Sequence, residues 1–360
     1  MAYAPARFDD ALIRVNLFSD TQTRPSRAMR EAMLDAPVGD EQHGADPSIN
    51  ALCERAAALL GKEAAVFMPT GTMCNQAAML TWCRPGDEIL AHESAHILSS
   101  EGGGVAALSG AQITGLRGAR GQFDVATLEA GFRDRSRYEP PQRLVAVEQT
   151  ANFAGGTVWP LEALDAIAAS AHAQGLATHM DGARMMNAVV ASGTAPAAMA
   201  AGWDSVWLDF TKGLGAPLGA VLAGSQAFID DVWRWKQRLG GALRQGGMCA
   251  AGCLYALDHN VDRLAEDHEN ARLLARGLAG VEGLEVELPE TNLVFFDTRG
   301  TGLEAAALAD ALVGEGVAIS AMGRYRGRAC THLDVDRAGV ALAETAFHRV
   351  VGAAASARAG

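Results

Sequence analysis

Lys212 and Asp181 are the residues whose types and settings most directly suggest chemistry. Lys212 lies in the glycine-rich run Asp209-Phe210-Thr211-Lys212-Gly213-Leu214-Gly215. Asp181 lies 31 residues earlier, where an apolar run ends in His179-Met180-Asp181-Gly182-Ala183-Arg184. A lysine amine can form a Schiff base with an aldehyde, and a carboxylate can keep a ring nitrogen protonated. Together the two residues indicate an aldehyde cofactor with an electron-accepting ring.

This pairing is typical of enzymes that use pyridoxal phosphate (PLP). Either residue alone would be weak support, because most lysines are solvated surface groups and most Asp-Gly pairs are turns. Pro69-Thr70-Gly71-Thr72 adds a third signal, since it follows a predicted strand and opens a predicted helix. Small residues there let backbone N–H groups and threonine hydroxyls approach a phosphate. The alternative is an ordinary strand-to-helix turn with a threonine N-cap.

Three arginines are candidates for binding anions. Arg244, flanked by glycines, could clamp a phosphate or carboxylate through its planar guanidinium group, although it could equally be a surface loop residue. Arg328 and Arg184 are further candidates for the carboxylate of an amino-acid substrate.

His92-Glu93-Ser94-Ala95-His96 matches the His-Glu-x-x-His pattern of zinc proteases. That pattern requires a helix, so that both histidines face the metal, and a third ligand. Here it directly follows a predicted strand and runs into Glu101-Gly102-Gly103-Gly104, which does not favour a helix. We therefore interpret the match as chance and predict no metal site.

Composition limits the other possibilities. With 360 residues, 49% of them hydrophobic, the chain is long enough for about two domains. Its net charge of -12 argues against a nucleic-acid backbone as the main partner. The six cysteines include no Cys-x-x-Cys pair and suggest free thiols of a reducing compartment. The uncharged run 185–203 is rich in small residues, which favours a helix and loop over a membrane span. These features predict a cytoplasmic protein.

Apolar strand-like runs alternate with helical stretches along most of the chain, as βαβ units with a mostly parallel sheet require. The predicted strands are 64–68, 87–91, 144–148, 176–180 and 205–209. Ligands of such sheets bind where strands end, and Thr70, Asp181 and Lys212 each follow a strand. We predict a large domain over 1–255. A smaller α+β domain follows over 256–360, with helices over 260–278, over 303–315 and from about 337, and strands at 284–286, 292–296 and 317–320.

The chain resembles the low-specificity L-threonine aldolases, a family of the PLP fold-type-I (aspartate aminotransferase-like) superfamily. The resemblance runs from about residue 18 to 351. It rests on Ser19-Asp20-Thr21-Gln22-Thr23-Arg24-Pro25, Val38-Gly39-Asp40, Pro69-Thr70-Gly71-Thr72-Met73, Ala95-His96-Ile97, His179-Met180-Asp181-Gly182-Ala183-Arg184, Thr211-Lys212-Gly213-Leu214, Arg244-Gln245, Glu266-Asp267-His268-Glu269-Asn270-Ala271 and Thr331-His332-Leu333-Asp334-Val335.

The resemblance implies a role for each matching residue. Lys212 would bind the PLP aldehyde, Asp181 would pair with the ring nitrogen, and His96 would stack on the ring. The residues implied to hold the cofactor phosphate are Gly71, Thr72, Thr211 and Arg244. Ser19, Arg184 and Arg328 would hold the substrate carboxylate. It also implies a homodimer or homotetramer with shared sites, in which Arg244 could reach a neighbouring subunit.

Three positions depart from the family pattern. Ala151 stands where many relatives have a histidine that is thought to contact the substrate hydroxyl, His43 where they often have tyrosine, and Gln237 where they usually have lysine. We therefore expect the catalytic base to be His96, His43 or a bound water. We also expect Ala151 to leave space for a bulkier, phenylserine-like substrate side chain.

These observations predict a PLP-dependent lyase that cleaves L-threonine or a related β-hydroxy-α-amino acid to glycine and an aldehyde. One alternative keeps the cofactor but catalyses β-elimination, racemisation or transamination of another amino acid. A second is a non-catalytic or zinc-binding protein, which would require Lys212 to be merely structural.

Overall fold

The computed structural model describes residues 10–134 and 136–359 and divides into two compact units. The larger unit spans Arg24–Asp262, and the smaller unit joins the described residues up to Thr23 with those from Arg263 onward. The N-terminal segment, predicted within a large domain over 1–255, therefore belongs to the small unit. The reason is that β1 (Val15–Asn16) pairs in parallel with β11 (Val317–Ala318). The second boundary lies at residue 262 instead of 255.

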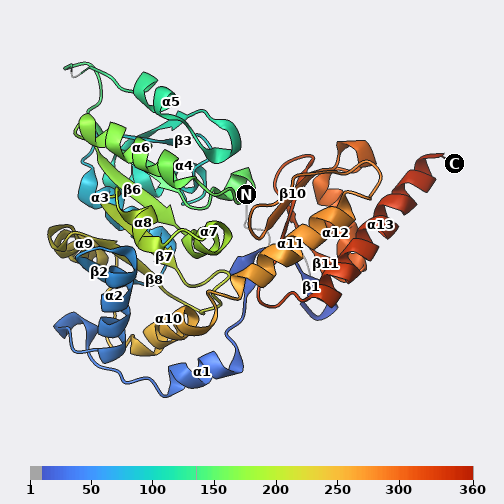
Figure 1. Ribbon diagram of the computed structural model, residues 1–360, viewed down its shortest axis with the longest axis horizontal. Helices are drawn as coiled ribbons and strands as arrows, with labels where there is room; N and C mark the ends of the chain where they lie inside the picture. The colour runs from blue at the N-terminus through green and yellow to red at the C-terminus, as the bar shows by residue number, and fades with distance from the viewer. Residues whose placement is uncertain (1–9, 135, 360) are drawn as a thin grey trace. The chain divides into compact units, whose positions relative to one another are not determined.

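A mostly parallel sheet forms the centre of the larger unit, as predicted (Figure 1). Within the described residues its strand order is β2-β8-β7-β6-β5-β3-β4, and only β8 runs antiparallel to its neighbours. The strands are β2 (Ala64–Met68), β3 (Glu88–His92), β4 (Gln112–Leu116), β5 (Gln142–Glu148), β6 (Ala177–Gly182), β7 (Ser205–Asp209) and β8 (Ala220–Gly224). The five predicted strands are all present, because each is an apolar run that the helices bury.

Helices cover the sheet. They are α1 (Arg27–Leu34), α2 (Pro47–Leu60), α3 (Gly71–Trp82), α4 (His96–Ser99), α5 (Val125–Ala130), α6 (Leu161–Ala173), α7 (Met185–Ser192), α8 (Pro196–Ala200), α9 (Gln226–Arg238) and α10 (Gly247–His259). Local signals set their ends. Asp46 caps α2 by accepting the backbone N–H groups of Ser48 and Ile49, and Gly61 closes it in the left-handed conformation.

The uncharged run 185–203 forms α7, a short connection and α8, so the predicted helix and loop are confirmed. In the described part of the chain, no helix combines the length and apolar character needed to cross a bilayer.

The register of the parallel strands determines which side chains meet at the edge where they end. Glu148 of β5 lies beside Asp181 of β6, and Asp181 lies beside Trp207 of β7. Because side chains alternate along a strand, these three residues share one sheet face. Helix α3 packs against β6 and β7 and lies over this face, since Asn75 of α3 contacts both Asp181 and Trp207.

The smaller unit is an α+β body of its own. In its described residues, a sheet of order β12-β13-β10-β9 is antiparallel throughout. Its further strands are β9 (Glu285–Val286), β10 (Leu293–Asp297), β12 (Ser320–Ala321) and β13 (Arg326–Cys330), and its helices are α11 (Leu264–Leu278), α12 (Ala305–Gly314) and α13 (Arg337–Ala359). The strand predicted over 317–320 is divided, because β11 pairs with β1 while β12 pairs with β13.

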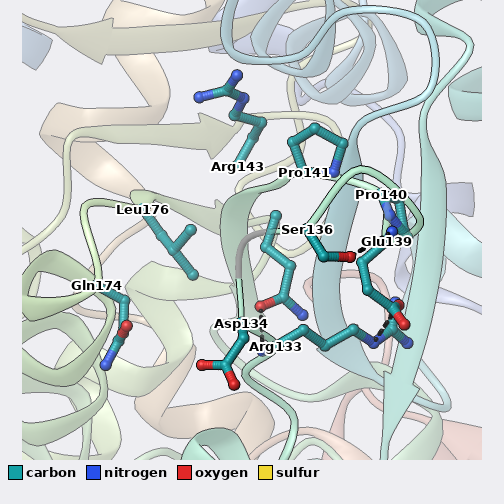
Figure 2. A pocket seen from close by; sticks show the side chains of 10 residues that line it. Arg133, Asp134, Ser136, Glu139, Pro140, Pro141, Arg143, Gln174 and Leu176 are labelled. Atoms are coloured by element: carbon teal, nitrogen blue, oxygen red, sulfur yellow. Dashed lines mark hydrogen bonds and ion pairs between the residues drawn. The ribbon is translucent and has the colours of Figure 1, made fainter.

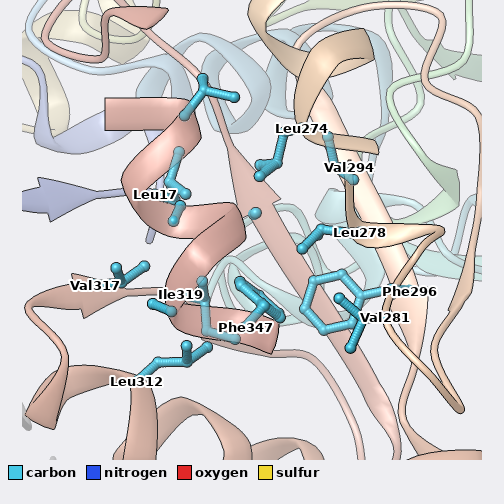
Figure 3. Close-up of a cluster of buried hydrophobic side chains, with 14 of the residues drawn as sticks. Leu17, Leu274, Leu278, Val281, Val294, Phe296, Leu312, Val317, Ile319 and Phe347 are labelled. Atoms are coloured by element: carbon cyan, nitrogen blue, oxygen red, sulfur yellow. The ribbon is translucent and has the colours of Figure 1, made fainter. Parts of the chain in front are cut away.

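A buried apolar cluster holds this unit together (Figure 3). Leu17 of the N-terminal segment packs in it with Leu274 of α11 and Phe347 of α13. The rings of Phe347 and Phe296 meet edge to face, with centroids 5.4 Å apart. Both chain termini therefore contribute to one hydrophobic core.

Phe347→Ala should destabilise the small unit, because the substitution leaves a cavity in this cluster and removes the ring contact with Phe296. Large-to-small core changes of this kind cost about 3–5 kcal/mol. Urea unfolding followed by circular dichroism measures the loss. Leu34→Ala, at a side chain that is 73% exposed, is the control and should change stability little. Equal, small effects of the two changes would contradict the cluster's role.

Candidate active site

Lys212 lies in the turn after β7 and is held by Asp209, the last residue of that strand. Its Nζ lies 2.9 Å from Oδ2 of Asp209, and its side chain is 20% exposed. The Nζ atom also lies 5.7 Å from the centre of the Trp207 ring. Asp209 Oδ1 accepts hydrogen bonds from the backbone N–H and the hydroxyl of Thr211. The lysine amine is thus fixed at the strand end and still partly accessible.

Asp181 is a buried carboxylate at the same sheet edge. Its Oδ1 accepts the backbone N–H of Ala183 at 3.0 Å, and its Oδ2 accepts from the side-chain amide of Asn75 at 2.9 Å. Burial raises the pKa of Asp181, the Asn75 hydrogen bond and the charge of Lys212 lower it, and Glu101 raises it further. Asp181 and Lys212 thus lie at the ends of the neighbouring strands β6 and β7, and Trp207 lies next to both residues.

His96 begins α4 and pairs with a buried acid. Its Nδ1 lies 2.9 Å from Oε1 of Glu101, and its backbone N–H donates to Glu148. Burial alone would lower the pKa of His96, but the hydrogen bond to Glu101 and the charges of Asp181, Glu101 and Glu148 outweigh burial and raise it. In the described structure Nε2 has no hydrogen-bond partner. His96 can therefore exchange a proton through Nε2 and favours its protonated form.

Glu148 accepts hydrogen bonds from two segments that meet at this edge of the sheet. It accepts the backbone N–H of His96 and, at 3.2 Å, that of Asn152. Burial and the charge of Asp181 raise the pKa of Glu148 to about 7, against the effect of these two donors. Asn152 in turn accepts a hydrogen bond from Arg184 Nη1 at 3.2 Å. Glu148 thus ties the backbone around His96 to the segment that meets Arg184.

The N-terminus of α3 offers backbone donors beside the Trp207 ring. The Thr70 hydroxyl caps the helix by accepting the N–H of Met73. A Cβ atom at Gly71 would lie 2.2 Å from the Trp207 ring, so only glycine fits at this position. Thr72 is exposed, and Thr211 reaches the same edge from β7. Gly71, Thr72 and Thr211 are thus placed around the ends of β2 and β7, on either side of β8.

Ala151 does not border open space. It is 2% exposed, and a Cβ atom at Gly121 would lie only 2.6 Å from its methyl group. The short turn Ala119–Gly121 therefore packs against the segment Asn152–Ala154. The expectation that Ala151 leaves room for a bulkier substrate side chain is wrong in this conformation, because this turn fills the adjacent volume.

His43 and Arg244 form an exposed cluster around Asp40. His43 Nδ1 and Arg244 Nη1 each lie 3.0 Å from Oδ2 of Asp40, and their side chains are 76% and 57% exposed. The buried pair of Glu41 and Lys236 anchors this segment, and Glu41 also accepts the N–H of Leu243. Neither His43 nor Arg244 pairs with Asp181 or Lys212. Gln237 is exposed on α9, one residue beyond Lys236.

Ser19 and Arg328 come together in the smaller unit. Both are nearly buried, at 6% and 7% exposure. Arg328 of β13 donates from Nη2 to the Phe18 carbonyl at 3.3 Å, next to Ser19. Ser19 accepts the backbone N–H and the hydroxyl of Thr21. Within the smaller unit, the guanidinium group of Arg328 therefore bonds to the residue next to Ser19. These are two of the residues predicted to hold a substrate carboxylate.

The His92-Glu93-Ser94-Ala95-His96 match is divided between a strand and a helix. His92 ends β3, and its ring nitrogens lie 2.8 Å from the Ser94 hydroxyl and 3.0 Å from the Gly118 carbonyl. His96 opens α4 and faces Glu101 instead. Residues 10–134 and 136–359 contain no group of three His, Cys, Asp or Glu side chains that could hold a metal ion.

A groove of about 460 Å³ lies at the other end of the parallel strands (Figure 2). Arg133, Glu139, Arg143 and Gln174 are among its lining residues. Gln142 begins β5 and Gln174 precedes β6, so the groove borders the amino ends of these strands. Ligands of such sheets bind at the carboxyl ends, where Asp181 and Lys212 lie.

Sequence reasoning did not identify three residues of the site: Asn75, Glu101 and Glu148. Each is a polar residue in a segment that is otherwise apolar or glycine-rich. Asn75 and Gln76 interrupt the apolar face of α3, and Glu148 ends an apolar strand. Such interruptions were the available signal, because a buried polar group requires a partner.

Known proteins resemble this chain over most of its length. The Beta-eliminating lyase family model matches residues 16–301. The low specificity L-threonine aldolase of Escherichia coli strain K12 is 40% identical over 335 residues, covering 93% of this chain and 98% of that protein. Low-specificity L-threonine aldolase 1 of Arabidopsis thaliana is 36% identical over 344 residues, covering 94% and 96%.

Solved structures share the fold. A threonine aldolase of Leishmania major superposes with a TM-score of 0.78 at 21% identity, covering 95% of this chain and 99% of the other. The aspartate aminotransferase of Rhizobium meliloti gives a TM-score of 0.69 at 14% identity, covering 94% and 91%. The fold is thus the aspartate aminotransferase-like type I fold. From the family match and the near full-length identity, the chain belongs to the Beta-eliminating lyase family, among the low-specificity L-threonine aldolases.

Proposed function

We propose that this protein uses PLP to cleave L-threonine, or a related β-hydroxy-α-amino acid, to glycine and an aldehyde. The observation that carries the proposal is that Lys212 and Asp181 lie at the ends of neighbouring strands, both next to Trp207. The near full-length similarity to threonine aldolases supports the choice of substrate.

The residues present fit PLP. The amine of Lys212 is held but accessible, and the buried carboxylate of Asp181 suits a protonated ring nitrogen. Gly71 lacks the side chain that would collide with Trp207, and the N-terminus of α3 supplies donors for a phosphate. PLP, when bound, supplies an electron-accepting ring for the electrons of the broken Cα–Cβ bond.

The remaining roles in the reaction are assigned to side chains of the protein. Lys212 would bind the cofactor aldehyde, and Asp181 would pair with the ring nitrogen. His96 would contact the ring and exchange a proton through Nε2. Because Glu101 favours its protonated form, His96 is better suited to donate that proton than to accept one. His43 pairs with Asp40 and is therefore a weaker candidate for the base than a bound water near His96.

The substrate carboxylate is proposed to bind Arg184. Arg184 is 5% exposed and is oriented by the Asn152 side chain. A guanidinium group can bind a carboxylate through two parallel hydrogen bonds. The role of Ser19 and Arg328 as carboxylate ligands stays a prediction from the sequence.

We propose a homodimer or homotetramer with shared active sites. Arg244 supports this proposal, because it is exposed and already held in position by Asp40. An exposed, oriented arginine can reach a phosphate in a neighbouring copy. A cytoplasmic location remains a prediction from composition.

Lys212→Ala should abolish acetaldehyde release from L-threonine, because no amine would remain to bind the cofactor aldehyde. A coupled alcohol dehydrogenase assay of PLP-loaded protein measures the release. Lys62→Ala is the matched control, since Lys62 donates to the carbonyls of Ala200 and Trp203 outside the proposed active site. Release that survives in Lys212→Ala would contradict the proposal, and formation of pyruvate from a β-substituted alanine by the wild-type protein would favour β-elimination instead.

Ala151→His should destabilise the protein without increasing threonine cleavage. The imidazole would have to displace the Ala119–Gly121 turn, and overpacking costs about 1–3 kcal/mol. Thermal unfolding and acetaldehyde release test this expectation. Ala154→Ser, a smaller change in the adjacent segment, is the control. A fully stable variant with faster cleavage would show that the turn yields and that position 151 faces the substrate.

A further inference from the structure

Asn75 occupies the centre of a buried network in which every hydrogen-bonding position of its amide is used. Its Nδ2 donates to Glu101 Oε1 at 2.7 Å and to Asp181 Oδ2 at 2.9 Å. Its Oδ1 accepts from Trp207 Nε1 at 2.8 Å and lies 3.1 Å from His179 Nε2. The side chain is 1% exposed.

The partners fix the orientation of this amide. Ionised carboxylates only accept and an indole nitrogen only donates, so the amide nitrogen must face Glu101 and Asp181. His179 must then donate from Nε2 and accept the Ser205 hydroxyl at Nδ1. Burial lowers the pKa of His179 to about 3, so this histidine stays neutral and holds that tautomer. The amide oxygen of Asn75 is therefore held by two fixed donors, Trp207 Nε1 and His179 Nε2.

Two buried acids of like charge share this one amide. Such a pair normally keeps a proton, because neighbouring carboxylates oppose each other's ionisation. The charged and titratable groups that act on this region are Glu101, Asp181, Glu148, His96 and Lys212. Among the described hydrogen bonds, the Asn75 amide alone reaches both Glu101 and Asp181.

We propose that Asn75 is a positioning residue that keeps Asp181 ionised beside Glu101. Asp181 can then hold a protonated ring nitrogen while Glu101 holds Nδ1 of His96. The role of the ring nitrogen rests on the proposed function, whereas the coupling of the two acids rests on the contacts of this chain alone. Asn75 reaches the two acids through the two N–H groups of its amide.

Asn75→Asp tests the proposal, since it keeps the shape and the oxygen acceptor but removes both donors. Gln76→Glu is the matched control, because Gln76 donates to Glu101 Oε2 at 2.6 Å and does not bond to Asp181. Both changes bring a new carboxyl group to Glu101. Only the first removes a donor from Asp181.

The first measurement uses cofactor-free protein. Carboxyl ¹³C NMR, assigned with Asp181→Asn, follows the titration of Asp181. Asn75→Asp should raise the pKa of Asp181 by about 1–3 units, as a neighbouring like charge does. Gln76→Glu should leave it nearly unchanged. Equal shifts in the two variants, or none in Asn75→Asp, would overturn the proposal whatever reaction the protein catalyses.

The second measurement uses PLP-loaded protein and the pH dependence of its visible absorption band. Asn75→Asp should move the midpoint by about one unit or more and weaken PLP binding about tenfold, and Gln76→Glu should do neither. A normal NMR shift with an unmoved band would reject the assigned role toward the cofactor. Wild-type protein that binds no PLP would reject the proposed function but leave the NMR result valid.

Thermal unfolding confirms that each variant is folded. If Asn75→Asp does not fold, Asn75→Ala replaces it, because a methyl group donates to neither acid and adds no charge. The pKa of Asp181 should then rise. An unchanged pKa of Asp181 in this variant would overturn the proposal.

Discussion

The parallel pairing of β5 with β6 is the constraint from which the site follows. In-register strands place Glu148 directly beside Asp181, and burial keeps water from separating their charges. Two adjacent acids in such a position would not both ionise without compensation. The surrounding structure supplies it through backbone N–H groups to Glu148, the amide of Asn75 to Asp181, and the nearby cations His96 and Lys212. The chemistry of this edge depends on how these groups share protons.

The compensating groups come from elements that the sheet brings together. Helix α3 contributes Asn75 over the sheet, α4 contributes His96, and the turn after β7 contributes Lys212. Each begins at a strand end, so the same topology that buries the acids also delivers their partners. This explains why the fold tolerates several acids in its interior, where unpaired charges would cost several kcal/mol each.

Much of the fold could be predicted from the sequence, because the strands are apolar runs and Lys212 and Asp181 carry recognisable neighbours. Asn75 could not be found in this way, since its importance arises from four partners on separate elements. The filled volume beside Ala151 depends on Gly121, which lies 30 residues away in a turn with no clear pattern. Strand β1 is only two residues long and gives no periodic signal. The sequence therefore predicts the N-terminal segment within the large domain, whereas the structure groups it with the smaller unit.

The smaller unit joins the N-terminal segment to residues from Arg263 onward, so it cannot form until both parts have been synthesised. Leu17 and β1 are made early, whereas their partners Val317 and Phe347 lie far later in the chain. The larger unit, continuous over Arg24–Asp262, can complete its sheet while the N-terminal segment still lacks a partner. Domains generally fold as units during synthesis. The smaller unit can therefore close only after its C-terminal residues have been made, when β1 and Leu17 gain the partners that bury them.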